Sequence, residues 1–420
     1  MGVIEKLAVP NVSRRGAKGS KRPANSVDQQ DRAEVACIVI VPGVATPVKA
    51  FCRIFFVADR QLETVGGVGS EFRVDSRGRA LVAGIQGRDQ RPTSFKNLRG
   101  DLALFSHSDQ VLHWQTSLPD RRITNQSGIG RGWGGRVADL LHSLNDSNQV
   151  SMNISIAGHN TFQTGTQIVP YGISDDGALV PEGFGGASAI DMARTSAITN
   201  QLDLEYSNLF ERTFVSNTKS ALDLASYFQS VIDDNPISVG MNDSNLEKDL
   251  KMVARNIKAA STFGHKRQTF FVSFGGWDHH DNTLSQQAGM LPVVSKALKK
   301  FRDALVEIGM LDKVTLFQTS DFGRTLTTNG QGSDHAWGGN YLVMGGGVNG
   351  GEVYGAYPDF NNLGPIDAGR GRLIPSTSVD EYVSELVQWF GVPPSELSTV
   401  LPNIGNFPNG SQTRPIGFLA

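Results

Sequence analysis

The sequence predicts an α/β protein in which helices cover both faces of a mostly parallel sheet. From Leu102 onward, short apolar runs typical of buried strands alternate with longer segments of helical periodicity. Parallel strands need long crossover connections, so this alternation favours a parallel sheet over a series of hairpins. The expected strands are residues 150–157, 269–274, 314–319 and 341–344. The expected helices are residues 135–143, 219–233, 244–260, 284–308 and 379–390.

The composition divides the chain into three parts. Residues 1–35 are rich in Ser, Arg, Lys and Gln, and we expect them to be disordered. Residues 36–95 form an atypical N-terminal region, in which apolar runs occur at 37–41, 54–57 and 80–85 without a clear period, so we assign no elements to it. Residues 96–420 are expected to form one α/β domain, which is long enough to bury a sizeable core.

Charge and hydropathy exclude several classes of protein. Residues 1–100 hold 17 Lys/Arg against 9 Asp/Glu, but no compact basic run with interleaved aromatics occurs there, so we expect no nucleic-acid partner. No uncharged apolar run reaches the length of about 18 residues that a transmembrane helix needs, so we expect no such segment. The two cysteines, Cys37 and Cys52, are too few for a disulfide framework or a cysteine-based zinc site.

The stretch Trp277-Asp278-His279-His280 follows a predicted strand and has the character of a metal site. Gly275 and Gly276 allow a tight turn after the strand. In an extended backbone, residues i and i+2 project to the same side, so Asp278 and His280 can reach one ion. A carboxylate and an imidazole are both ligands of divalent metals.

Asp321 and Arg324 follow the next predicted strand of this region, residues 314–319. Ligands of parallel α/β sheets bind beyond the carboxyl ends of the strands, which is where Asp321 lies. Arg324 can bind an anionic substrate or orient the carboxylate. The alternative is an aspartate that caps a turn at the end of the strand. The sequence Asp-Phe-Gly also occurs in protein kinases, but the other kinase motifs are missing.

His335 lies in a glycine-flanked segment that we expect to be a loop before the strand at 341–344. It is a third candidate metal ligand, and Asp334 is either a further ligand or a group that orients one. A structural histidine is the alternative.

Ser106 precedes a probable helix, where backbone N–H groups and the helix dipole favour an anion. A serine at this place can attack a phosphoryl or sulfuryl centre if a metal lowers the pKa of its hydroxyl. It can equally be an ordinary helix N-cap, and a Ser-His-Asp triad formed with His107 and Asp109 also stays open, although no Gly-x-Ser-x-Gly elbow is present.

Taken together, these motifs resemble one large bacterial family, known as domain of unknown function 1501 and grouped with the alkaline phosphatase and sulfatase superfamily. The motifs that carry the resemblance are Gly276-Trp277-Asp278-x-His280, Ser320-Asp321-Phe322-Gly323-Arg324-Thr325, Asp334-His335-x-Trp337-Gly338 and residues 343–348, with Ser106-His107, Trp114-Gln115-Thr116 and residues 132–136. The resemblance covers roughly residues 100–400. It implies an alkaline-phosphatase-like three-layer α/β/α sandwich and a periplasmic or secreted protein.

The resemblance also implies roles for single residues. Ser106 takes the position of the nucleophile, Asp278 and His280 bind one metal, Asp321 binds a second and His335 is the last ligand. The implied cofactors are divalent cations, with zinc first and calcium, manganese or magnesium as alternatives. The implied substrate is a small-molecule or glycan ester of phosphate or sulfate.

Three features depart from the family pattern. Members begin with a strand and an Arg-Gly-Gly-x-Asp motif whose Asp binds metal, and this sequence lacks it, with Asp59 as the only substitute we can suggest. Phe322 stands where a histidine often follows the second carboxylate. Arg14-Arg15 is followed by polar residues, so we expect no intact twin-arginine signal peptide. The sequence therefore predicts a metal-dependent ester hydrolase, with a non-catalytic binding or cell-envelope protein that keeps the fold as the alternative.

Overall fold

The computed structural model describes residues 34–41, 79–86, 107–118, 131–336, 338–356, 358–361, 363–407, 409 and 414–420, and for the first two of these ranges the backbone only. All of them belong to one compact unit, Arg32–Ala420. Residues 1–35 were expected to be disordered, but Glu34 and Val35 belong to strand β1 (Glu34–Val41). Residues 1–33 and the candidate residues Asp59 and Ser106 lie outside the described residues.

Ten of the described strands form one sheet with the order β11-β2-β10-β7-β1-β6-β3-β4-β5, in which β12 also pairs with β2. Their bounds are β1 (Glu34–Val41), β2 (Arg79–Gln86), β3 (Asn153–Ser155), β4 (Tyr171–Ser174), β5 (Gly177–Ala178), β6 (Gln268–Gly275), β7 (Thr315–Ser320), β10 (Gly339–Gly345), β11 (Val353–Tyr354) and β12 (Thr377–Ser378).

Most strands of this sheet point the same way. Because β6 and β7 both pair antiparallel with β1, they run parallel to each other. The pairings of the remaining strands place β2, β3, β4, β11 and β12 in the same direction and β5 and β10 in the opposite one. The predicted mixed α/β architecture with a largely parallel sheet is confirmed. The three reversed strands were not predicted, because a hydrophobic period does not report which strands become neighbours.

Two apolar runs that the sequence left unassigned become strands of this sheet. Residues 37–41 belong to β1, which lies between β6 and β7, and residues 80–85 belong to β2 beside β10. The neighbours of both strands lie far along the chain, at β6 and β7 for β1 and at β10 for β2, so local sequence does not report these pairings.

Helices of the described residues are α2 (His107–Thr116), α4 (Trp133–Leu141), α5 (Ala189–Leu202), α6 (Leu209–Asp233), α7 (Asn245–Lys258), α8 (Thr283–Glu307), α9 (Val379–Phe390) and α10 (Leu397–Val400), with 3-10 turns η1 (His142–Leu144), η2 (Leu311–Lys313), η3 (Pro394–Glu396) and η4 (Ile404–Asn406). Each of the five predicted helices is present. The α9 prediction is correct to the residue because Ser378 and Glu381 form a capping box and Gly391 ends the helix at a φ of 117°. Among the described helices, none combines the length and the apolar character that crossing a bilayer requires.

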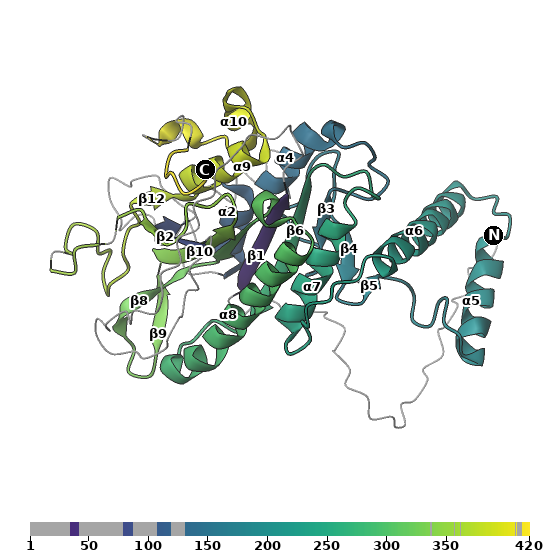
Figure 1. The fold of residues 1–420 in the computed structure, drawn as a ribbon, viewed down its shortest axis with the longest axis horizontal. Coiled ribbons are helices and arrows are strands. Elements are labelled where there is room, and N and C mark those ends of the chain that lie inside the picture. The colour runs from purple at the N-terminus through teal and green to yellow at the C-terminus, as the bar shows by residue number, and fades with distance from the viewer. Residues whose placement is uncertain are drawn as a thin grey trace, which may run out of the picture. The chain divides into compact units, whose positions relative to one another are not determined.

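Side chains of the central strands point alternately into two apolar cores, one on each face of the sheet. In β6, Phe270 and Val272 enter a core shared with α6, α7 and α8, whereas Phe271 enters one shared with α2, α4 and α9. β7 does the same with Leu316 and Phe317. Helices therefore pack on both faces of the sheet, as Figure 1 shows for α7 and α8 on one face and α9 on the other.

A second, two-stranded sheet follows β7 directly. β8 (Gly323–Thr328) and β9 (Ser333–Ala336) form an antiparallel hairpin, which was not predicted. The segment of His335, expected to be a loop, is strand β9. The glycines around His335 led us to predict a loop, but hydrogen bonding to β8 holds this segment in an extended conformation.

Candidate metal centre

Asp278 and His280 lie just beyond the carboxyl end of β6. The chain turns away from the strand at Gly276, whose φ of +98° is a conformation that glycine adopts without strain. The two side chains then point to the same place, because Asp278 Oδ1 and His280 Nε2 are 3.0 Å apart. The loop at Gly332 packs so closely on the backbone of His280 that a side chain there would collide with it.

The β8–β9 hairpin contributes two further groups. Arg324 and His335 are directly paired across the hairpin, so their side chains lie next to each other. Both reach the same atom of Asp278. Arg324 Nη1 donates to Asp278 Oδ1 at 2.8 Å, and His335 Nε2 lies 3.1 Å from that oxygen.

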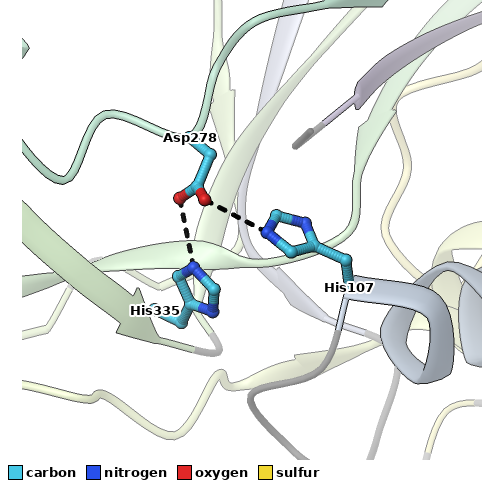
Figure 2. A group of neighbouring side chains, drawn as sticks. All are labelled: His107, Asp278 and His335. Carbon is cyan, nitrogen blue, oxygen red and sulfur yellow. Dashed lines mark hydrogen bonds and ion pairs between the residues drawn. The ribbon is translucent and has the colours of Figure 1, made fainter. Parts of the chain in front are cut away.

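A third histidine, His107, enters from the opposite side. It is the first residue of α2, and its Nε2 lies 3.2 Å from Asp278 Oδ2. Figure 2 shows both carboxylate oxygens of Asp278 engaged, one toward His107 and the other toward His335. The two histidines and Asp278 form the group of metal-ligating side chains that the described residues bring together within 4.8 Å.

Asp321 orients His107 from behind. It follows β7, is almost completely buried, and its Oδ2 lies 2.5 Å from His107 Nδ1. This contact assigns the N–H of the imidazole to Nδ1, so a neutral His107 presents a lone pair on Nε2 toward Asp278. A lone pair and a carboxylate oxygen repel each other unless a proton or a metal ion lies between them.

Asp334 does the same for His280. Its Oδ1 lies 3.2 Å from His280 Nδ1, while His280 Nε2 faces His335 Nε2 at 2.9 Å. Asp334 is held in turn by Arg370 at 2.6 Å and by Asn329 at 3.1 Å. The arrangement is the carboxylate–histidine pair that supports many metal ligands.

The local charges change two pKa values in the cluster. Burial alone would raise the pKa of Asp278, but His335, Arg324 and His280 lower it below its ordinary value. Burial alone would lower the pKa of His107, yet its contacts with Asp321 and Asp278 raise it overall. Without a metal, the cluster therefore holds an ionised Asp278 and favours a protonated His107.

Outside the central group, Asn329 and Arg370 act on Asp334. They lower its pKa to about 2, with the hydrogen bond from Asn329 as the largest cause. Asp334 is thus an anion over the whole physiological pH range.

The donor atoms fit a transition metal. In a tetrahedral shell with metal–ligand distances of 2.0–2.1 Å, neighbouring ligand atoms lie roughly 3.3 Å apart. The separations between Asp278 and the three Nε2 atoms, and between His280 and His335, run from 2.9 to 3.2 Å. His107, Asp278 and His335 offer two imidazoles and one carboxylate within 4.8 Å of one another, and His280 lies beside Asp278 and His335. Imidazole ligands suit zinc, whereas calcium, magnesium and manganese prefer oxygen ligands.

Phe322 and Arg324 lie beside the cluster. Phe322 stacks on His335 with ring centroids 3.7 Å apart and also contacts His107 at 4.6 Å. Nε and Nη2 of Arg324 are buried and have no hydrogen-bond partner among the described residues, while Nη1 binds Asp278. A buried unpaired donor costs about 1–3 kcal/mol, so these two groups favour an anion placed beside them.

The candidate residues from the sequence occupy distinct places. Asp278, His280 and His335 bring donor atoms to one point, and Arg324 binds Asp278. Asp321 and Asp334 lie behind His107 and His280 and do not join the central group. For Asp321 this differs from the expected role as ligand of a second metal, since His107 stands between it and Asp278.

His107 was not predicted from the sequence as a member of this cluster. It was considered only together with Ser106, as part of a helix start or a triad. The available signal was its place directly after the candidate nucleophile in a motif shared with the resembled family. Its link to the cluster is a contact with Asp321 across 214 positions, which no local pattern contains.

A comparison with known protein families gives a match for part of the chain. Residues 195–363 fit the family described as Protein of unknown function (DUF1501). The expected resemblance to this family is confirmed over that range, which includes Asp278, His280, Asp321, Arg324 and His335 but not His107. Searches of the curated proteins and of the solved structures gave no match.

Proposed function

We propose that this protein is a metal-dependent hydrolase of phosphate or sulfate esters, with the metal held by Asp278, His280, His335 and His107. The observation that carries the proposal is that the Nε2 atoms of three histidines point to the carboxylate of Asp278. Two of these histidines, His107 and His280, also contact a second carboxylate through Nδ1. Lone pairs that face one another across about 3 Å need a proton or a metal ion between them, and this donor set favours zinc as the metal.

Metal binding also agrees with the charges of the residues behind the ligands. Asp321 and Asp334 accept from the Nδ1 atoms of His107 and His280, which keeps both Nε2 atoms free for the ion. When bound, the ion would polarise an ester oxygen and lower the pKa of a nearby hydroxyl group.

An anionic substrate is supported by Arg324. The unpaired Nε and Nη2 groups of this buried guanidinium can donate to two oxygens of a phosphate or sulfate group. Asp278 fixes the opposite nitrogen, so the guanidinium is oriented before a substrate arrives. The role of Arg324 in this proposal is to bind and orient the anionic part of the ester.

Ser106 is the proposed nucleophile. It directly precedes His107, whose ring belongs to the cluster, and it takes the nucleophile position in the superfamily that the sequence resembles. Attack of its hydroxyl oxygen on phosphorus or sulfur would release the alcohol, and water would then release the anion. An alkaline-phosphatase-like sandwich and a periplasmic or secreted location are parts of the same proposal.

A non-catalytic protein that binds one metal is the second candidate. It is favoured by Phe322, whose ring covers His335 where the resembled superfamily often has a further metal-binding histidine. Because Phe322 supplies no metal-binding nitrogen beside Asp321, the short contact of Asp321 among the described residues is with His107 and not with a second metal-binding histidine.

The two candidates are separated by measuring metal content and turnover in the full chain. We expect about one zinc per chain and cleavage of an aryl phosphate or aryl sulfate ester that stops on chelation. Asp278→Asn should remove both the metal and the turnover, whereas Ser106→Ala should keep the metal and lose the turnover. Metal binding without turnover supports the second candidate, and a wild-type chain that binds no metal contradicts both.

A further inference from the structure

Two motifs that the sequence shares with the resembled family are not used by the proposed metal centre, and the structure brings them together. Trp114-Gln115-Thr116 ends α2, and residues 132–136 contain the N-cap and the first turn of α4. α2 begins at His107, whose Nε2 atom lies 3.2 Å from Asp278 Oδ2, as Figure 2 shows. A helix of ten residues is about 15 Å long, so the first motif lies at the end of α2 that is remote from the cluster.

Arg136 binds this end of α2 through its guanidinium group. Nη2 donates to the backbone carbonyl of Thr116, the last residue of α2, at 2.6 Å. Nε donates to the carbonyl of Val400 at 2.7 Å, and Nη1 donates to that of Arg131 at 3.0 Å. The last carbonyls of a helix lack partners within the helix and carry the negative end of its dipole, so a cation is favourable here. One guanidinium group thus joins three separate segments of the chain.

Two further contacts hold α2 at the same end. The carbonyl of Trp114 accepts a hydrogen bond from Nε1 of Trp133 at 3.0 Å. Oε1 of Gln115 accepts from the backbone N–H groups of Thr161 and Phe162, at 2.9 and 3.0 Å. Together with the guanidinium contact, these hydrogen bonds form what we call the α2 anchor. Each residue of the first motif therefore takes part in holding this end of the helix.

Two glycines of the second motif allow α4 to approach the loop that Gln115 binds. A Cβ atom at Gly132 would lie 2.2 Å from the carbonyl oxygen of Phe162, and one at Gly135 would lie 2.1 Å from the backbone of Thr164. A side chain at either position would collide with this backbone, so only glycine fits. The N–H group of Gly135 donates to the carbonyl of Phe162 at 2.8 Å. Because α4 begins this close to the loop, its first turn reaches the end of α2.

Both the charge and the shape of Arg136 suit this place. Burial lowers the pKa of Arg136 to about 10, while Asp380 acts in the opposite direction. The guanidinium group is therefore a cation at neutral pH. Its planar fork serves three carbonyls at once, whereas the ammonium group of a lysine is a single point charge. The substitution Arg136→Lys would therefore keep the charge and lose part of the α2 anchor.

We propose that Arg136 is a positioning residue, which holds His107 in the cluster by fixing the far end of α2. No glycine or proline interrupts α2, so a displacement of one end also displaces the other. Metal–ligand distances vary by only about 0.2 Å within sites of one kind, so a small displacement of His107 weakens its bond to an ion. The contact of His107 with Asp321 depends on the same placement. This inference rests on the proposed metal centre and not on the cleavage of an ester.

Calorimetric zinc titration of the full chain tests the proposal. We expect Arg136→Lys to lower zinc affinity about 10-fold. In a chain that already carries His107→Gln, the same substitution should change zinc affinity less than about twofold, because α2 then carries no proposed ligand. A loss of equal size in both backgrounds would mean that Arg136 acts on the structure as a whole, and it would overturn the proposal.

Arg267→Lys is the matched control. Nε of Arg267 donates to the carbonyl of Phe390, the last residue of α9, at 3.0 Å, and α9 carries no proposed ligand. Zinc affinity should therefore stay unchanged in this variant. Should Arg136→Lys fail to fold, Gln115→Leu takes its place in every measurement, with the same outcomes. Gln115→Leu removes the other side-chain contact between α2 and its surroundings and should lower zinc affinity about fivefold.

Urea denaturation of the metal-free protein separates failure of this inference from failure of the metal centre. Substitutions at distant sites usually lower the urea midpoint additively. If Arg136 acts on the contact of His107 with Asp321, then Arg136→Lys and Asp321→Asn together lower the midpoint by clearly less than the sum of their single losses. Arg267→Lys combined with Asp321→Asn should be additive.

The zinc content of the wild type determines which measurement decides. If the wild type binds zinc, the titration decides. If it binds none, the proposed metal centre is contradicted and the urea midpoints decide. Non-additive losses then support the positioning role of Arg136, and additive losses overturn it.

Discussion

His107 and His280 belong to the same cluster, but the carboxylates that orient them have opposite surroundings. The inner pair, His107 with Asp321, is buried, with side chains 12% and 0% exposed. The outer pair, His280 with Asp334, lies at the surface at 46% and 27%. Asp321 depends on the position of β7, whereas Asp334 is held by Arg370 and Asn329. In the proposed metal site, the inner pair would therefore set the position of the ion, and the outer pair would adjust its affinity.

The largest effect is expected from Asp321→Asn. An amide in place of the buried carboxylate removes the charge that fixes the tautomer of His107, so zinc affinity should fall about 100-fold. Breaking a buried charged pair should also lower the free energy of unfolding of the metal-free protein by about 3 kcal/mol. Isothermal titration calorimetry and urea denaturation measure the two changes. Asp176→Asn, at an exposed aspartate in a turn, is the control and should change neither.

Asp334→Asn should have a smaller effect on the same quantities. Since Asp334 orients His280 from the surface, we expect zinc affinity to fall about 10-fold while the free energy of unfolding stays nearly constant. A loss as large as that for Asp321→Asn would contradict the distinction between the inner and outer pairs.

Arg370→Gly tests the outermost contact. Arg370 has a φ of +64°, a backbone conformation that glycine adopts more easily, so the substitution removes the guanidinium without backbone strain. Zinc affinity should fall about threefold, because Asn329 still holds Asp334. Raising the salt concentration from 0.05 to 1 M should weaken zinc binding to the wild type by a similar factor and leave the variant nearly unchanged. Arg370→Lys, which keeps the charge, should recover part of the loss.

The smallest effect concerns pH and the metal-free protein. The folded-state pKa of His107 is raised above its ordinary value of 6.5, so the stability it contributes is complete below that pH. This contribution is lost as the pH rises through the raised pKa. Urea denaturation should show the decline in the metal-free wild type, and His107→Gln should abolish it. With zinc bound the trend should reverse, because the metal displaces the proton and binds more weakly as the pH falls.

The inner and outer pairs also differ in how far the sequence predicted them. Asp278 and His280 share one short motif after a strand, so the local rule of alternate side chains predicted that they meet. His335 and Arg324 were named as candidates, but their pairing depends on the β8–β9 hairpin, whose short strands have no clear hydrophobic pattern. The contact of His107 with Asp321 joins two elements that only the sheet brings together.

The fold shows the same limit. The five predicted helices and four predicted strands all have apolar positions that the two cores explain. α5 was missed because most of its residues are exposed, and Ile190 and Met192 interrupt the expected amphipathic period. β1 was left unassigned because its place depends on β6 and β7, far along the chain.

The position of β1 has a consequence for how the protein acquires its site during synthesis. β1 separates β6 from β7, so the strands that carry Asp278 and Asp321 are about 9.5 Å apart, a gap that the imidazole of His107 spans. Its residue Glu34 pairs with Gly275, and Val35 pairs with Ser320. At about 5–20 residues per second, the ribosome needs roughly 12–50 s to reach Gly275 after Glu34. β1 must stay unpaired for that time, and because pairing across such sequence distances is slow, we expect the metal ligands to assemble late in folding.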